Sequence, residues 1–148
     1  MKVKPNNYIA VEFLSRSVNE GFARTATAAF AAQLDPTIDE LGDVKTAVSE
    51  AVTNAIVHAY PDALGKISLR ASIFDGNVLE IVVRDWGCGI PDVEQAREPL
   101  YTTGGEERSG MGFTIMESFM DALIVRSKPG RGTVVTMKRR IAQRTGRK

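Results

Sequence analysis

The spacing of apolar residues changes part-way along the chain. Residues 17–33 place apolar side chains every three to four positions, which is typical of a helix with one buried face. Residues 66–74 instead alternate apolar and polar side chains, which is typical of a strand with one buried face. A second alternating segment, residues 78–83, follows the hairpin signal Asp75-Gly76-Asn77. The pattern therefore predicts helices early in the chain and strands later.

The same patterns, with the turn residues between them, predict a complete order of elements. They are a strand at 8–15, helices at 17–33 and 37–59, strands at 66–74 and 78–83, a helix at 111–120 and strands at 122–127 and 133–138. Because the strands come in consecutive pairs, antiparallel pairing is favoured. We predict an α/β two-layer sandwich, with a mixed, mainly antiparallel sheet covered on one face by helices.

Two local signals refine this order. Ser17 with Glu20, and Thr37 with Glu40, have the spacing of capping boxes at the starts of the two early helices. Residues 87–112 are rich in glycine and charge. A loop of this length in a compact domain is usually functional.

Composition and charge place the chain in a broad class. It has 148 residues, 25% charged and 43% hydrophobic, with a single cysteine and so no internal disulfide. We find no apolar run long enough to span a membrane and no signal peptide, so we expect a cytoplasmic protein. We assign residues 1–137 to one domain and residues 138–148 to a basic tail. That tail could bind nucleic acid or an acidic partner, or be a frayed terminus.

A polar stripe marks the second predicted helix. Glu50, Asn54 and His58 are spaced four residues apart, so they lie on one side of a helix otherwise rich in alanine and valine. An asparagine can offer an oxygen to Mg²⁺, and a glutamate can accept a proton. An ordinary solvent-facing stripe would have the same spacing.

Three further segments carry candidate chemistry. Asp85 ends an apolar strand, followed by Gly87 and Gly89, which allow close backbone approach to a flat ligand. A plain Asp-x-Gly turn is the alternative. Residues 104–113 form a glycine-rich loop that contains Arg108 and leads into a helix, as suits a phosphate chain or simply a flexible connector. Thr133 opens the last strand after a glycine turn and could lie beside a ligand or only end a hairpin.

These segments occur in the order of a known superfamily. The sequences SEAVTNAIVHAY (49–60), DWGCGIP (85–91) and RSGMGFTIM (108–116) resemble the N box and the two glycine boxes of the gyrase/Hsp90/histidine-kinase/MutL ATP-binding proteins. Within that superfamily, the chain resembles the anti-sigma factor serine kinases, in particular the anti-sigma F factors of spore-forming bacteria. The fragments FAR (22–24) and AAQLDPT (31–37) support this narrower similarity, which covers residues 19–137.

The resemblance implies a Bergerat-type fold and roles for individual residues. Glu50 would be the general base, and Asn54 would bind Mg²⁺. Asp85 would bind the adenine amino group, and Arg108 would contact the γ-phosphate. The other residues implied in nucleotide binding are His58, Gly87, Gly89, Thr102, Thr103, Ser109, Gly110, Met111, Gly112 and Thr133. Thr102 and Thr103 would belong to a lid over the nucleotide, and Arg24 would lie on a partner-binding surface.

The resemblance also implies partners. Members of this family use ATP to phosphorylate a serine on an anti-anti-sigma factor, and as homodimers they bind a sigma factor, here sigma F. They contact neither nucleic acid nor membrane directly. A histidine kinase would need a histidine-bearing helix pair upstream, and a gyrase-type ATPase would need a following transducer domain. The alternative that we keep is a module that binds ATP and sequesters a partner without kinase activity.

Overall fold

The computed structural model describes residues 3–98 and 112–142, which form a single five-stranded sheet. The strands are β1 (Asn7–Leu14), β2 (Lys66–Phe74), β3 (Val78–Asp85), β4 (Ala122–Lys128) and β5 (Gly132–Arg140). Their order in the sheet is β1-β2-β3-β5-β4. All four neighbouring pairs among these strands are antiparallel, so the sheet is wholly antiparallel rather than mixed.

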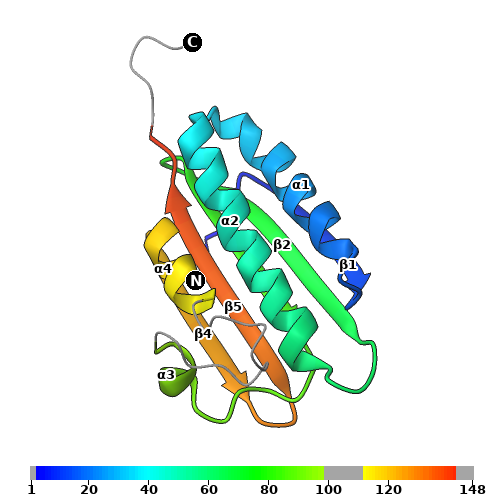
Figure 1. Ribbon diagram of the computed structural model, residues 1–148. Coiled ribbons are helices and arrows are strands. Elements are labelled where there is room, and N and C mark those ends of the chain that lie inside the picture. Colours follow the sequence, from blue (N-terminus) through cyan, green and yellow to red (C-terminus); the bar gives the residue numbers. More distant parts are fainter. Residues whose placement is uncertain (1–2, 99–111, 143–148) are drawn as a thin grey trace.

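The helices form a second layer on one face of the sheet (Figure 1). The longer ones are α1 (Asn19–Ala31), α2 (Ile38–Asn54) and α4 (Gly112–Phe119), and α2 packs against both of the others. Shorter turns are η1 (Ala32–Leu34), η2 (Ala55–Ala59) and α3 (Val93–Ala96). None of these helices is long and apolar enough to cross a membrane. The predicted two-layer sandwich is confirmed, whereas α3 lies in a segment predicted to be loop.

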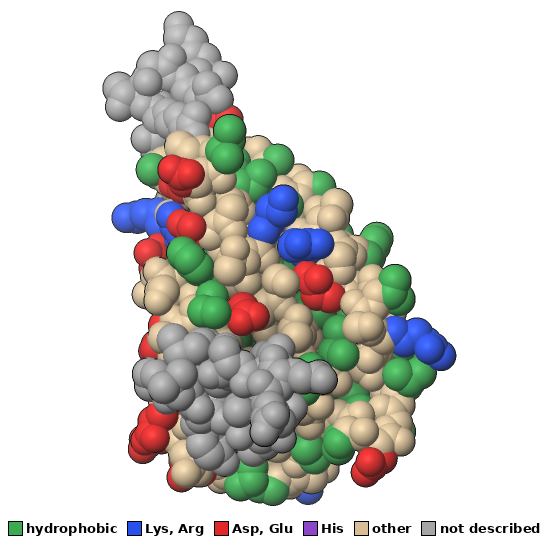
Figure 2. Space-filling view, viewed as in Figure 1, with side chains coloured by type: hydrophobic (Ala, Val, Ile, Leu, Met, Phe, Trp, Pro, Cys, Tyr) green, Lys and Arg blue, Asp and Glu red, His purple; other side chains and the backbone are tan. Residues whose placement is uncertain are grey.

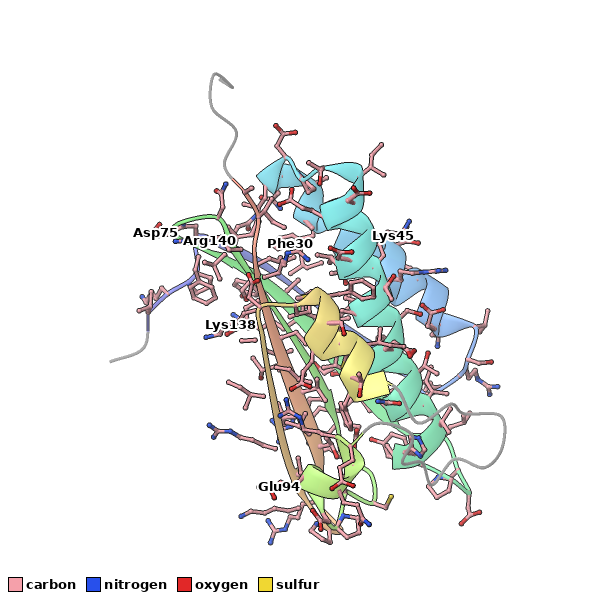
Figure 3. The ribbon with its side chains drawn as sticks, turned by 60° about the vertical axis from the view of Figure 1, so that its left-hand side comes forward. Phe30, Lys45, Asp75, Glu94, Lys138 and Arg140 are labelled. Atoms are coloured by element: carbon pink, nitrogen blue, oxygen red, sulfur yellow. The ribbon has the colours of Figure 1, made fainter. Side chains whose placement is uncertain are left out.

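The core lies between the inner face of the sheet and the inner side of α2. Its large, fully buried side chains include Val44, Val48, Val52, Ile67, Leu69, Leu79, Ile81, Met116 and Met137. Each such burial stabilises the fold by about 1.5–3 kcal/mol. Within the described residues no helix covers the other face of the sheet, and Lys138 points away from the helices on that side (Figure 3). The alternation of apolar and polar residues in the strand sequences is therefore explained by a sheet with one buried face.

The two predicted capping boxes have different outcomes. The Thr37 hydroxyl accepts the Glu40 N–H at 3.0 Å, and the Glu40 carboxylate accepts the Thr37 N–H at 2.9 Å, so α2 has the predicted box. The box at Ser17 is wrong. Val18 is the N-cap of α1, with helical backbone angles and no capping side chain, and Ser17 offers only its carbonyl oxygen to the Glu20 N–H. Because Val18 is already helical, the Ser17 hydroxyl is not placed to cap.

The last turn of the second helix is wider than the rest. η2 continues α2 to Ala59, as predicted, but with the spacing of a π-helix. Such turns are rare and occur frequently at functional sites. This turn carries His58 and contacts β3 and β5.

The predicted boundary at residue 138 falls inside β5, which runs to Arg140. The next side chain, Ile141, is 1% exposed, and the Ala142 N–H donates to the Glu40 carboxylate at 2.9 Å. Arg139 pairs with Asp43 of α2 at 2.9 Å. These contacts make residues 138–142 part of the folded domain. The alternation of buried and exposed residues in β5 continues as far as Ile141. The rest of the predicted tail lies outside the described residues.

The two helix starts provide a matched test of capping. Thr37→Ala is expected to lower the free energy of unfolding by about 1 kcal/mol, because the Glu40 N–H loses its side-chain acceptor. The control Ser17→Ala is expected to change it by less than about 0.5 kcal/mol. Urea denaturation at 25 °C measures both. Equal losses in the two variants would contradict the assignment of the caps.

Candidate functional site

A cavity of about 360 Å³ lies where α2 and η2 face the ends of β3 and β5. This volume is within the range of small-molecule binding sites. The lining is mostly apolar, with a few polar groups. Its residues are Ala51, Asn54, Ala55, His58, Ala59, Val83, Asp85, Cys88, Gly89, Ile90, Pro91, Asp92, Gln95, Ala96, Gly112, Phe113, Thr133 and Val135. A flat ring with a few hydrogen-bonding groups suits such a lining.

Asp85 is the buried acid of this cavity. It ends β3 and is 6% exposed. Its Oδ1 accepts the backbone N–H groups of Gly87 at 3.0 Å and Thr133 at 3.2 Å. Burial raises the pKa of Asp85, while these two hydrogen bonds act in the opposite direction. Among the described residues, Oδ2 is the oxygen left to accept a hydrogen bond from a ligand.

The two glycines after Asp85 lie where the neighbouring backbone approaches closely, and Gly89 also lines the cavity. A methyl group on Gly87 would lie 2.1 Å from the carbonyl oxygen of Ala59, and one on Gly89 would lie 2.2 Å from that of Lys128. Gly89 also has a φ of +79°. The close approach is therefore to the protein backbone of η2 and of the β4–β5 turn. This packing closes one wall of the cavity.

The polar stripe of the second helix is divided between two hollows. Asn54 and His58 line the cavity. Glu50, one turn earlier, lines instead a shallow groove over α1 and α2, together with Arg24, Gly42, Lys45, Thr46 and Ser49. Lys45 points away from the sheet (Figure 3), and basic and acidic side chains lie close together on this helical face (Figure 2).

The start of α4 meets the cavity beside Asn54. A methyl group on Gly112 would lie 2.9 Å from the Asn54 side-chain nitrogen. A larger residue at position 112 would therefore require the Asn54 amide to move. The predicted residues Thr102, Thr103, Arg108, Ser109, Gly110 and Met111 lie outside the described residues.

Sequence reasoning missed Ser127, whose hydroxyl contacts that of the cavity-lining residue Thr133. The Thr133 hydroxyl lies 2.7 Å from the Ser127 hydroxyl. Ser127 also accepts the Ile90 N–H at 2.7 Å and donates to the Gly132 carbonyl oxygen at 3.0 Å. The available signal was the alternation of β4, because Ser127 follows Leu123 and Val125 on the face of the sheet that carries the core. The lining residues of α3 gave no such signal.

Comparison with known proteins agrees with this geometry. The profile of the histidine kinase-like ATPase domain matches residues 13–139. A protein named anti-sigma F factor from Caldanaerobacter subterraneus subsp. tengcongensis is 59% identical over 139 residues, which cover 93% of this chain and 96% of that protein. A protein of the same name from Geobacillus stearothermophilus is 58% identical, with 90% and 92% covered. The chain belongs to the anti-sigma F factors, within the histidine kinase-like ATPase family.

Solved structures extend the similarity of fold beyond the anti-sigma F factors. A Mycobacterium tuberculosis structure of RsbU and RsbW domains aligns with a TM-score of 0.66 at 18% identity, and covers 93% of this chain and 32% of that one. The histidine kinase domain of a blue-light activated kinase from Erythrobacter litoralis aligns with a TM-score of 0.57 at 23% identity, with 84% and 60% covered. At these identities the comparison concerns the fold alone.

The buried acid provides a direct test of the cavity. Asp85→Asn is expected to weaken ATP binding at least about tenfold, because a charged acceptor is replaced by a neutral amide. Trp86, the only tryptophan, adjoins Asp85 and is 39% exposed, so its fluorescence can report the titration. Asp75→Asn is the matched control, since Asp75 lies at the other end of the sheet from Glu94 of α3 (Figure 3). Unchanged ATP affinity in Asp85→Asn would refute the expectation that Asp85 binds the adenine amino group.

Proposed function

We propose that this protein is an ATP-dependent serine kinase that inhibits a sigma factor and phosphorylates a serine on its own antagonist, the anti-anti-sigma factor. The observation that carries the proposal is the mostly apolar cavity with the buried Asp85 carboxylate at one side. A carboxylate oxygen there can accept a hydrogen bond from the 6-amino group of adenine, while Val83, Val135 and Ile90 flank the ring. The names of the relatives support the same class of function.

The rest of the nucleotide would extend from Asp85 and Thr133 towards Asn54 and the start of α4. Asn54 and Gly112 line the same cavity and lie against each other. Backbone N–H groups at the start of a helix favour phosphate. We extend this proposal to Thr102, Thr103, Arg108, Ser109, Gly110 and Met111, which the sequence places in the predicted glycine-rich loop and its flank and which would hold or cover the phosphates. His58 lines the cavity one helical turn after Asn54 and would contact the nucleotide from that side.

Asn54 is the proposed protein ligand of Mg²⁺. Among the described residues, no group of three or more His, Cys, Asp or Glu side chains could hold a metal ion. An ion at Asn54 would therefore be bound largely through phosphate oxygens and water, as Mg²⁺ commonly is. When bound, Mg²⁺ neutralises the charge that develops on the phosphates during transfer. The neutral amide of Asn54 fits this role.

Glu50 is the proposed general base, and its position supports transfer to a protein rather than to a free small molecule. It lies one turn from Asn54 but opens onto the groove over α1 and α2. A serine presented there would give its proton to Glu50 as its oxygen bonds to the γ-phosphorus and the bond to the β-phosphate oxygen breaks, releasing ADP. The nucleotide and the acceptor would thus approach α2 through separate openings.

The groove also suggests how partners are held. Arg24 is 41% exposed at its side chain, pairs with Glu20 at 3.4 Å and lines the groove with Lys45. Two cations beside the proposed base would favour an acceptor segment that carries acidic residues. We assign this surface to the anti-anti-sigma factor and to sigma F in a sporulating cell's cytoplasm. The acting form would be a homodimer that contacts no nucleic acid or membrane.

Replacing the proposed base separates catalysis from binding. Glu50→Gln is expected to reduce phosphorylation of the anti-anti-sigma factor by at least about a hundredfold, with ATP affinity nearly unchanged because Glu50 is not part of the cavity lining. Radiolabelled ATP, Mg²⁺ and the partner, followed by a gel, measure transfer. Glu12→Gln, on the open face of the sheet, is the control. A wild-type rate of transfer in Glu50→Gln would refute the assignment of Glu50 as the general base. If the unmodified protein transfers no phosphate, the alternative function, a module that binds ATP and sequesters a partner, would be supported instead.

A second variant tests the partner surface. Arg24→Ala is expected to weaken binding of sigma F and of the anti-anti-sigma factor by about tenfold or more, because it removes a charge from the groove. ATP affinity should stay the same. Arg126→Ala, on the opposite face of the sheet, is the matched control, and surface plasmon resonance with each partner is the measurement. Equal effects of the two variants would remove Arg24 from the interface.

A further inference from the structure

Tyr60 joins three segments of the chain at the edge of the cavity. It directly follows η2, and its hydroxyl donates to the carbonyl oxygen of Lys66 at 2.6 Å, where β2 begins. The same hydroxyl accepts the backbone N–H of Trp86 at 2.8 Å, just after β3 ends at Asp85. Because the carbonyl can only accept and the amide can only donate, the direction of both hydrogen bonds is determined.

Packing and protonation both hold Tyr60 in this arrangement. A methyl group on Gly65 would lie 2.2 Å from the Tyr60 ring, so the ring packs closely against the backbone before β2. Burial raises the pKa of Tyr60, and the nearby Asp85 carboxylate acts in the same direction. The phenol therefore keeps the proton that it donates to Lys66. The Lys66 ammonium in turn lies 4.3 Å from the centre of the Trp86 ring.

The Trp86 amide lies at the start of the loop that orients Asp85. The next N–H along the chain, that of Gly87, donates to Asp85 Oδ1 at 3.0 Å. The amide after that, Cys88, donates to the carbonyl oxygen of Ala59, the residue before Tyr60. Tyr60 and Ala59 thus hold successive parts of the loop whose amide orients the Asp85 carboxylate.

We propose that Tyr60 is a positioning residue that orients Asp85 towards the 6-amino group of the bound purine. The proposal rests on the proposed function, since it assumes that Asp85 binds that amino group. Removing the hydroxyl would free the Trp86 amide and loosen the Gly87 contact. The Asp85 carboxylate would remain in the cavity but would turn away from the direction in which it meets the amino group.

A merely structural role for Tyr60 would have a different signature. General loosening of the cavity would weaken every nucleotide in proportion. Misorientation of Asp85 weakens only ligands that carry the 6-amino group. Purine riboside triphosphate, which has hydrogen in place of that group, therefore separates the two roles.

The experiment compares Tyr60→Phe with the unmodified protein for ATP and for purine riboside triphosphate, by calorimetry with Mg²⁺ present. The unmodified protein is expected to prefer ATP about tenfold or more. In Tyr60→Phe, ATP affinity should fall about five- to tenfold, while affinity for the analogue changes less than about twofold. Combining Tyr60→Phe with Asp85→Asn should add little to the loss from Asp85→Asn alone. Tyr8→Phe, on the open face of the sheet, is the control.

The possible failures are distinguishable. If the unmodified protein binds neither nucleotide, the proposed function fails. If it prefers ATP but Tyr60→Phe keeps that preference, or loses both ligands equally, only the role of Tyr60 is overturned. Should Tyr60→Phe not fold, hydrogen exchange of the Trp86 amide in the unmodified protein decides instead. Protection that rises with ATP but not with the analogue supports the role, and equal protection overturns it.

Discussion

A buried carboxylate held by two backbone amides is the constraint on which this site depends. Removing an aspartate from water is costly unless hydrogen bonds replace the lost hydration. One of these amides belongs to Gly87, in the loop after β3, and the other belongs to Thr133, at the start of β5. Asp85 can therefore remain in the cavity only while β3 and β5 are paired in their observed register and the glycine loop lies against η2.

Helix α2 connects the two hollows of the molecule. Its inner side, with Val44, Val48 and Val52, is fully buried against the sheet. That packing holds the polar residues of the helix in place relative to β3 and β5. Asn54 consequently faces the cavity, while Glu50 faces the groove over α1 and α2. In the proposed function, this single helix would present a nucleotide-binding group to the cavity and a proton acceptor to the groove.

Much of the fold could be predicted from local patterns. The strand at 66–74 was placed with its bounds correct, and the capping box at Thr37 was confirmed, because alternation and cap spacing are local properties of the sequence. The box at Ser17 failed because the same spacing was outweighed by helical geometry at Val18. The end of β5 was underestimated because Lys138, Arg139 and Arg140 look like a solvated tail, although Arg139 pairs with Asp43.

By itself, the sequence determined the order of the strands and the longer helices, the one-sided sheet and the family, since these follow from periodicity and from motifs contiguous in the chain. Only the tertiary structure decided which residues share a site. It separated Glu50 from Asn54 despite their regular spacing, and it brought Tyr60, Lys66 and Trp86 together through one hydroxyl. The physical reason is that hydrogen bonds and packing between distant segments depend on where the helix lies on the sheet, which no local pattern records.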